Sequence, residues 1–201
     1  MRNRFEFPLL AAAALLCACG PARPTNTGQP DSVSAAAAAF SQRQGGDAMA
    51  FTVQSTAFTA GGTIPARYTC DGANLSPALS WKDAPAGTQS LALIADDPDA
   101  PAGTWTHWIL WNLPPQATLL PEGVPPSETL ANGARQGRNN FQRLGYGGPC
   151  PPPGKAHRYF FRLYALDARL DQKPGAVRSE LEAAMQGHVL AQSEWMGRYA
   201  R

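Results

Sequence analysis

Two polar segments, well separated in the sequence, carry most of the side chains that could do chemistry. The first runs from Asp96 to Pro101 and leads into His107. The second runs from Gly145 to Tyr159 and contains His157. Together they supply imidazoles, hydrogen-bond donors and turns stiffened by Gly and Pro, which are the groups that a small anion site needs. The sequence therefore predicts a pocket for a phosphate or carboxylate group where the two segments meet.

Different side chains in these segments suit different roles. Gly148, like Gly147, has no Cβ, so its backbone can approach a ligand closely. Asp97 and Asp99 repel a phosphate, so we expect one to fix an imidazole tautomer and the other to tie down the turn around Pro98. A simpler interpretation is a tight turn beside two histidines that belong to the core. Each motif alone fits that interpretation, whereas their combination favours a pocket.

The first residues of the chain are typical of an export signal. Arg2 and Arg4 precede an apolar run from Phe7 to Ala18, which is shorter than the roughly 18 or more apolar residues that cross a bilayer. Leu16 lies three places before Cys19, as in a bacterial lipobox. We therefore expect residues 1–18 to be a lipoprotein signal peptide and Cys19 to carry the lipid; a cleaved signal without lipid is the alternative.

Composition separates a tether from a domain. Residues 19–50 mix Pro, Thr, Ser, Gln and Gly with an alanine run and lack the apolar periodicity of a core, which predicts a flexible tether. Residues 51–201 have the length of one ordinary domain. The formal net charge of the chain is +2, and its Lys and Arg residues are scattered. This pattern disfavours nucleic-acid binding and a polybasic membrane surface.

The position of Cys19 also bears on location. Export of a lipidated protein would place it in the cell envelope, held at a membrane by the lipid. Gly20 and Pro21 follow the cysteine, with no Asp of the kind that retains lipoproteins in the inner membrane. This favours the outer membrane where one exists.

Two cysteines, Cys70 and Cys150, remain in the predicted domain. In an oxidising compartment they are expected to form a disulfide. A zinc site is a rival use, but neither belongs to a Cys-x-x-Cys pair. Two free buried thiols are a further alternative.

The domain is rich in strand patterns and poor in helix patterns. Strands are predicted over residues 51–58, 90–95, 105–113 and 157–166. The last of these has two mostly apolar faces, which suggests a strand covered on both sides. One helix is predicted from apolar residues that recur every three to four positions between Val177 and Met196. Ser179 and Glu182 form a possible capping box, a start at Ala176 is also possible, and Gly187 interrupts the pattern. These elements predict a mainly β fold, an antiparallel β-sandwich with peripheral helices.

Several stretches match one family in order. They are residues 68–77, 96–101, 107–108, 145–152, 157–160 and 187–191. Over Phe51 to Tyr199 the sequence resembles the phosphatidylethanolamine-binding protein family, in its bacterial Raf-kinase-inhibitor-like branch of the YbhB/YbcL type. The resemblance implies an antiparallel β-sandwich with an anion pocket at one end, and no metal or redox cofactor. The family's pocket residues correspond to Asp97, Pro101, His107, Gly148, His157 and Tyr159.

The sequence departs from this branch before Gly145. The usual Gly-x-Asn-Asp-Phe-Gly is replaced by residues 137–142, with Asn140 in place of the acid and Gln142 in place of the second Gly. Asn140 removes a charge near the expected rim, and Gln142 removes a flexible residue. We expect the fold to tolerate both, with an effect on ligand preference.

The function expected from these features is binding rather than catalysis. The leading hypothesis is a lipid-anchored envelope protein, with a binding or regulatory role, that takes a phosphate or phosphorylethanolamine-like group. One alternative is a hydrolase that uses the same His and Asp cluster, although the chain has no His-Glu-x-x-His or Gly-x-Ser-x-Gly motif. Another is an inhibitor of an envelope protease or kinase that acts through the Pro-rich surface loop.

Overall fold

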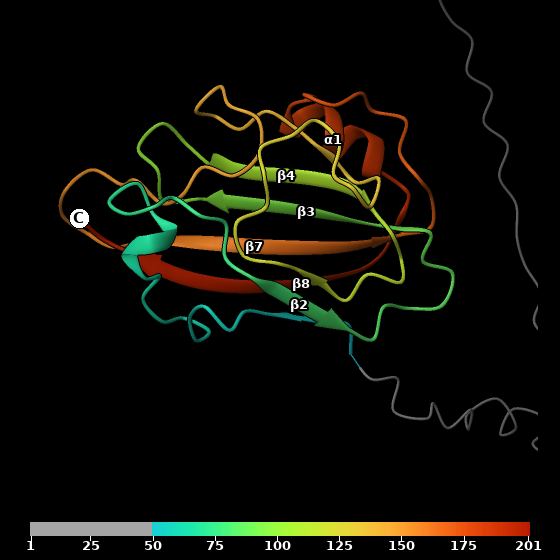
Figure 1. Ribbon diagram of the computed structural model, residues 1–201, viewed down its shortest axis with the longest axis horizontal. Helices are drawn as coiled ribbons and strands as arrows, with labels where there is room; N and C mark the ends of the chain where they lie inside the picture. Colours follow the sequence, from blue (N-terminus) through green and yellow to red (C-terminus); the bar gives the residue numbers. More distant parts are fainter. Residues whose placement is uncertain (1–49) are drawn as a thin grey trace, which may run out of the picture. The chain divides into compact units, whose positions relative to one another are not determined.

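Two antiparallel β-sheets pack face to face in residues 50–201, the part of the chain that the computed structural model describes (Figure 1). The small sheet has the strand order β1 (Thr52–Gln54), β2 (Leu79–Lys82), β5 (Leu119–Leu120). The large sheet has the order β6 (Arg135–Gln136), β4 (Trp105–Leu113), β3 (Ser90–Asp97), β7 (His157–Leu166), β8 (Val189–Tyr199). A 3-10 helix, η1 (Ala66–Tyr68), and an α-helix, α1 (Arg178–Met185), complete the described elements. The predicted signal peptide, Cys19 and most of the predicted tether lie outside the described residues.

The large sheet is covered on both faces, and strand β3 shows how the sequence produces this. Every residue of β3 is buried, and successive side chains point to opposite faces. Leu91 and Leu93 join the core between the two sheets, with Val53 and Trp81 of the small sheet. Ile94 points the other way, into a second cluster.

That second cluster lies between the large sheet and the helix. Leu181 and Met185 of α1 pack there against Ile109 and Trp111 of β4. Burial of each such large apolar side chain contributes roughly 1.5–3 kcal/mol. The mainly β sandwich with one helix near the end of the chain is thus confirmed. No helix within residues 50–201 is long and apolar enough to cross a membrane.

The central strands follow their sequence patterns closely. β4 and β7 begin and end at the predicted residues, β3 runs two residues further to Asp97, and β1 is much shorter than residues 51–58. On β7, the side that includes Tyr159 and Phe161 is buried, while Phe160 and Tyr164 on the other side are half-buried. The expectation that β7 is covered on both faces is therefore met fully on one face only.

The predicted helix between Val177 and Met196 is wrong in its second half. α1 ends at Met185, and residues 189–199 form edge strand β8, which pairs along the length of β7. Gly187 has φ of 82° and ends the helix, as glycine often does, instead of interrupting it. The start also differs: Glu180 accepts the N–H of Val177 at 2.9 Å, so the acidic cap is Glu180 and not Glu182.

Candidate functional site

Three of the predicted site residues come together at one end of the large sheet. Asp97 is the last residue of β3, His157 is the first of β7, and His107 is the third of β4. Because β3 is antiparallel to both neighbours, its end lies beside their beginnings. In Figure 1 this is the left side, where the arrowhead of β3 lies. Sheet topology therefore brings the two polar segments of the sequence together.

His107 occupies an irregularity in the pairing of β3 with β4. Ala95 pairs with Trp108 and Asp96 pairs with Thr106, so His107 has no partner on β3. Such a bulge redirects a side chain and is common beside binding sites. Gly147 contacts both the backbone and the ring of His107. Its N–H donates to the His107 carbonyl at 2.9 Å, and its carbonyl lies 2.6 Å from His107 Nδ1.

His157 is held by an acidic turn. Its Nδ1 lies 2.8 Å from Asp97 Oδ2, while Asp97 Oδ1 accepts the N–H of Asp99 at 2.8 Å. Asp99 in turn takes two hydrogen bonds from the Arg158 guanidinium, at 2.8 and 2.7 Å. These bonds hold the pKa of Asp99 at about 2. The expected roles are present but are divided differently: Asp97 both holds His157 and closes the turn around Pro98, while Asp99 joins that turn to Arg158 of β7.

A small pocket opens between the two histidines. Its volume is about 170 Å³, and it is lined by Asp97, Ala100, Pro101, Trp105, His107, Phe141, Cys150, Pro151, Pro152 and His157. The polar groups of the lining residues are the two imidazoles, the Asp97 carboxylate and the buried Trp105 indole N–H, which has no hydrogen-bond partner within residues 50–201; aromatic and proline side chains form the walls. Of the six ligand-binding residues predicted, the lining includes Asp97, Pro101, His107 and His157.

The other two predicted site residues lie behind the lining. Gly148 donates its N–H to Asn74 Oδ1 at 2.7 Å, and a Cβ on it would lie 2.3 Å from the Tyr68 carbonyl oxygen. Because Gly148 has no side chain, its loop can pack closely against the loop that contains Tyr68 and Asn74. Tyr159 is buried, with its ring against the His107 ring at 5.2 Å between centroids. Burial, and then the Asp97 carboxylate, raise the pKa of Tyr159.

Phe141 is a pocket residue that sequence reasoning missed. Its ring packs edge-on against His107 and Trp105, at 5.4 Å in each case. Its place between Asn140 and Gln142, in the segment that resembles the family's Gly-x-Asn-Asp-Phe-Gly pattern, was the available signal.

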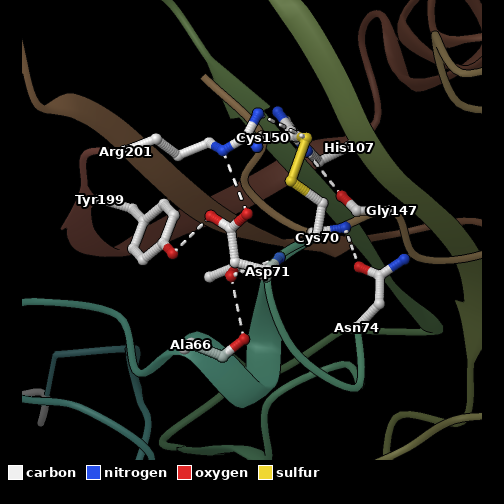
Figure 2. Close-up of a disulfide and its surroundings, with 11 residues drawn as sticks. Ala66, Cys70, Asp71, Asn74, His107, Gly147, Cys150, Tyr199 and Arg201 are labelled. Carbon is white, nitrogen blue, oxygen red and sulfur yellow. Dashed lines mark hydrogen bonds and ion pairs between the residues drawn. A yellow bond between two sulfur atoms is a disulfide. The ribbon is translucent and has the colours of Figure 1, made fainter. Parts of the chain in front are cut away.

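A disulfide ties the pocket wall to the neighbouring loop (Figure 2). Cys70 and Cys150 are bonded, in agreement with the disulfide expected from the sequence. Cys150 lines the pocket, and the Cys70 N–H donates to the carbonyl of Pro149 at 3.0 Å. Next to the bond, Asp71 accepts from Tyr199 Oη at 2.8 Å and pairs with Arg201 at 3.1 Å. The loop from Cys70 to Asn74 therefore supports the Pro-rich wall.

Asp96 serves the opposite face of the sheet, although it is adjacent to Asp97. Its side chain is buried and forms ion pairs with Arg162 of β7 and Arg178 of α1. The sequence motif includes Asp96, but the alternation of side chains along β3 turns it away from the pocket. Its contacts join the helix to the sheet.

Burial shapes the electrostatics of His107. It lowers the pKa of the ring, and the Gly147 carbonyl and the Asp97 carboxylate oppose this more weakly. Within residues 50–201, no group of three or more His, Cys, Asp or Glu side chains is arranged to hold a metal ion. The arrangement is suited to holding a small polar group between two oriented imidazoles in a mostly apolar cavity.

Comparison with known proteins gives one family. The pattern of the family described as phosphatidylethanolamine-binding protein matches residues 54–200. A UPF0098 protein of Methanothermobacter thermautotrophicus is 54% identical over 149 residues, which cover 74% of this chain and 98% of the relative. A UPF0098 protein of Aquifex aeolicus is 48% identical over 151 residues, covering 74% of this chain and 88% of the relative.

Solved structures agree with these sequence relationships. The crystal structure of a putative phosphatidylethanolamine-binding protein homolog from Chlamydia trachomatis superposes with a TM-score of 0.69 at 41% identity, covering 76% of this chain and 98% of that one. YbcL of E. coli, described as a new member of the mammalian PEBP family, gives a TM-score of 0.71 at 33% identity, covering 75% and 98%. The chain therefore belongs to the phosphatidylethanolamine-binding protein family, and its role is that of a ligand-binding or regulatory protein.

Proposed function

We propose that this protein binds a small oxyanion, free or as the phosphate of a head group, in the pocket between His107 and His157. One observation carries the proposal: both imidazoles line one small cavity, and each is oriented by a second group through Nδ1, at 2.6 Å from Gly147 O and 2.8 Å from Asp97. Two rings held in this way present their remaining nitrogens without a loss of side-chain freedom on binding. The function is binding, with no chemical step.

The dimensions of the pocket favour a small group. Its volume of about 170 Å³ is below the 300–1,000 Å³ typical of sites for drug-sized ligands. A phosphate or carboxylate with a short substituent suits this space better than an acyl chain does. The walls formed by Trp105 and Phe141 keep the interior apolar, which strengthens each hydrogen bond made there.

We also propose that the domain acts in the cell envelope, attached through lipid on Cys19. The disulfide between Cys70 and Cys150 supports an oxidising compartment, since such bonds persist outside the reducing cytosol. Labelling with a radioactive fatty acid in a bacterial host tests the anchor. The wild-type chain should take up label and pellet with membranes, and a Cys19→Ala variant should do neither. Label that is retained in the variant would contradict lipidation at this residue.

The binding site itself is tested by calorimetric titration of residues 50–201 with phosphate and phosphorylethanolamine. Residues 50–201 are a suitable unit for this experiment. The UPF0098 protein of Methanothermobacter thermautotrophicus aligns with this chain over 98% of its own length, so that relative consists of little more than the matching domain. Wild type should bind, and a His107→Ala/His157→Ala double variant should remain folded and lose binding. Absence of binding by wild type would overturn the proposed function. Turnover of phosphate or carboxylic esters, abolished by His157→Ala, would favour a hydrolase instead.

A further inference from the structure

The protons of the two pocket histidines are placed by their partners. A backbone carbonyl only accepts hydrogen bonds, so the 2.6 Å contact with Gly147 O requires a proton on His107 Nδ1. Likewise, a carboxylate only accepts hydrogen bonds, so the 2.8 Å contact with Asp97 Oδ2 places a proton on His157 Nδ1. Each ring therefore has Nε2 as the polar atom left for a ligand. In a neutral imidazole of this tautomer, Nε2 carries a lone pair and accepts a hydrogen bond.

The surroundings of the two rings differ in charge. His107 is packed by Phe141 from the loop, by the uncharged Tyr159 from β7 and by the Gly147 backbone; Asp97 and Asp96 of β3 are the nearby carboxylates, and neither bonds to it. Burial disfavours the charged form of this ring. His107 is therefore a neutral acceptor.

His157 has charged neighbours on the elements around it. Asp97 contacts its Nδ1, the ion pair between Asp99 and Arg158 lies beside it, and Tyr199 is its partner on β8. A second proton on this ring, at Nε2, would have the Asp97 carboxylate as its counterion. Of the two rings, His157 is thus the one suited to donate to an anionic oxygen.

An anion without any proton fits such a pocket poorly. Its oxygens would face the lone pair of His107 Nε2, with the Asp97 carboxylate also in the lining. An oxyacid anion that keeps one hydroxyl group avoids this conflict, since the hydroxyl donates to His107 Nε2 while an ionised oxygen accepts from His157. Resting on the proposed function, we infer that the pocket selects oxyanions that retain an acidic hydroxyl group, such as a phosphate monoester monoanion, over anions of equal charge that have none.

Methylphosphonate and methanesulfonate form a matched pair of probes for this inference. Both are small tetrahedral anions with one methyl group, and at about pH 6 both carry roughly one negative charge, but only the phosphonate keeps a hydroxyl proton. Without that proton, a buried acceptor stays unpaired, which is expected to weaken binding by about ten- to a hundred-fold. Calorimetric titration of residues 50–201 should therefore show methylphosphonate binding more tightly by this factor.

Three results are distinguishable. Tighter binding of methylphosphonate supports the inference. Equal affinity for the two probes overturns it but leaves the anion pocket in place. Failure of phosphate and both probes to bind overturns the proposed function as well.

Two further experiments test whether the ligand keeps its hydroxyl proton in the pocket and whether His107 accepts the hydrogen bond from it. Titrations at about pH 8 in buffers of different ionisation enthalpy should show that methylphosphonate takes up about one proton more on binding than methanesulfonate does, because the free phosphonate is then mostly a dianion, whereas any proton taken up by His157 is common to both probes. Equal proton uptake with the two probes would contradict the inference. A His107→Gln variant places an amide that can donate as well as accept near the Nε2 position. The preference for methylphosphonate should shrink in this variant. A preference that persists in the folded variant would mean that His107 is not the acceptor.

Discussion

The carboxylate of Asp97 lies 2.8 Å from Nδ1 of His157 and joins the end of β3 to the beginning of β7. A second pair of the same kind, Asp167 with His188, also at 2.8 Å, lies at the opposite end of β7 on the exposed surface. The same contact therefore occurs twice in the domain, once in the pocket and once far from it. The pair outside the pocket provides a control for the pair inside it.

Replacing Asp97 with Ala should weaken phosphate binding by about ten- to a hundred-fold, because partners that orient a metal-binding imidazole typically contribute this much and Asp97 orients His157 in the same way. Asp167→Ala removes the equivalent partner of His188 and should leave the affinity unchanged. Calorimetry on both variants measures the effect. A similar loss in both would point to a general effect on stability instead of orientation of His157.

Asp96→Ala should have the opposite outcome from Asp97→Ala. It leaves Arg162 and Arg178 without their shared counterion, and breaking a buried pair costs about 3–5 kcal/mol. We expect the lower end of that range, because both guanidinium groups retain some access to water. Urea unfolding should show the loss of stability, while phosphate affinity at temperatures where the variant is folded should stay near that of wild type. A clear fall in affinity would mean that the two faces of β3 are coupled.

The stability of the protein should fall as the pH drops below about 6.5, in part because of His107. Burial lowers the pKa of His107 from its ordinary value of 6.5, so at mildly acidic pH the unfolded chain binds a proton that the folded chain does not. Stability therefore rises with pH in this window, by up to about 1.4 kcal/mol per pH unit for one group. Urea unfolding of wild type and His107→Gln across the window measures it. Parallel curves for the two proteins would contradict the assignment.

Removal of the disulfide should lower the free energy of unfolding by about 2–5 kcal/mol. The bond closes a loop between residues separated by 80 positions, which restricts the unfolded chain strongly. A Cys70→Ser/Cys150→Ser variant should be less stable than oxidised wild type. Wild type in reductant should match the variant, and the variant should not respond to reductant. A deficit of the variant that remains in reductant would come from the substitutions themselves and not from the missing bond.

The parts of the fold that local patterns encode were predictable. β4 is rich in aromatic and β-branched residues and stops at Pro114, and β7 alternates two mostly apolar faces after the turn at Gly154, so their limits follow from the sequence. β8 was missed because its inward face mixes the small residues Ala191, Ser193 and Gly197 with the large residues Trp195 and Tyr199. Gly197 is required there, since a Cβ would lie 2.5 Å from Ile64. No alternation of large apolar residues marks this strand.

The site was predictable in its chemistry but not in its geometry. The two histidines were recognisable as residues of one pocket, yet the bulge that displaces His107 depends on how β4 pairs with β3, which no local pattern encodes. The same holds for Asp96 and Asp97, whose different roles follow from the face of the sheet to which each points. Phe141 reaches the pocket through a loop path that only the folded structure defines.

Gln142 has a backbone conformation that suits glycine better. Its φ is 62°, whereas the other non-glycine residues with positive φ in residues 50–201 are Asn74, Asp83 and Asn112, of the types that tolerate this region. Left-handed backbone costs most side chains about 1–2 kcal/mol. The departure from the family's usual Gly at this position therefore has a stability cost, which is partly offset by the lower freedom of Gln in the unfolded chain.

Gln142→Gly should accordingly raise the free energy of unfolding by about 0.5–1 kcal/mol, measured by urea unfolding. Gln116→Gly is the matched control, because Gln116 is also exposed but does not have positive φ. That substitution should lower stability, by up to about 1 kcal/mol, since glycine adds freedom to the unfolded chain without relieving strain. If both variants lose stability, the strain at Gln142 is smaller than the entropy that its side chain saves, and the loop tolerates Gln at no net cost.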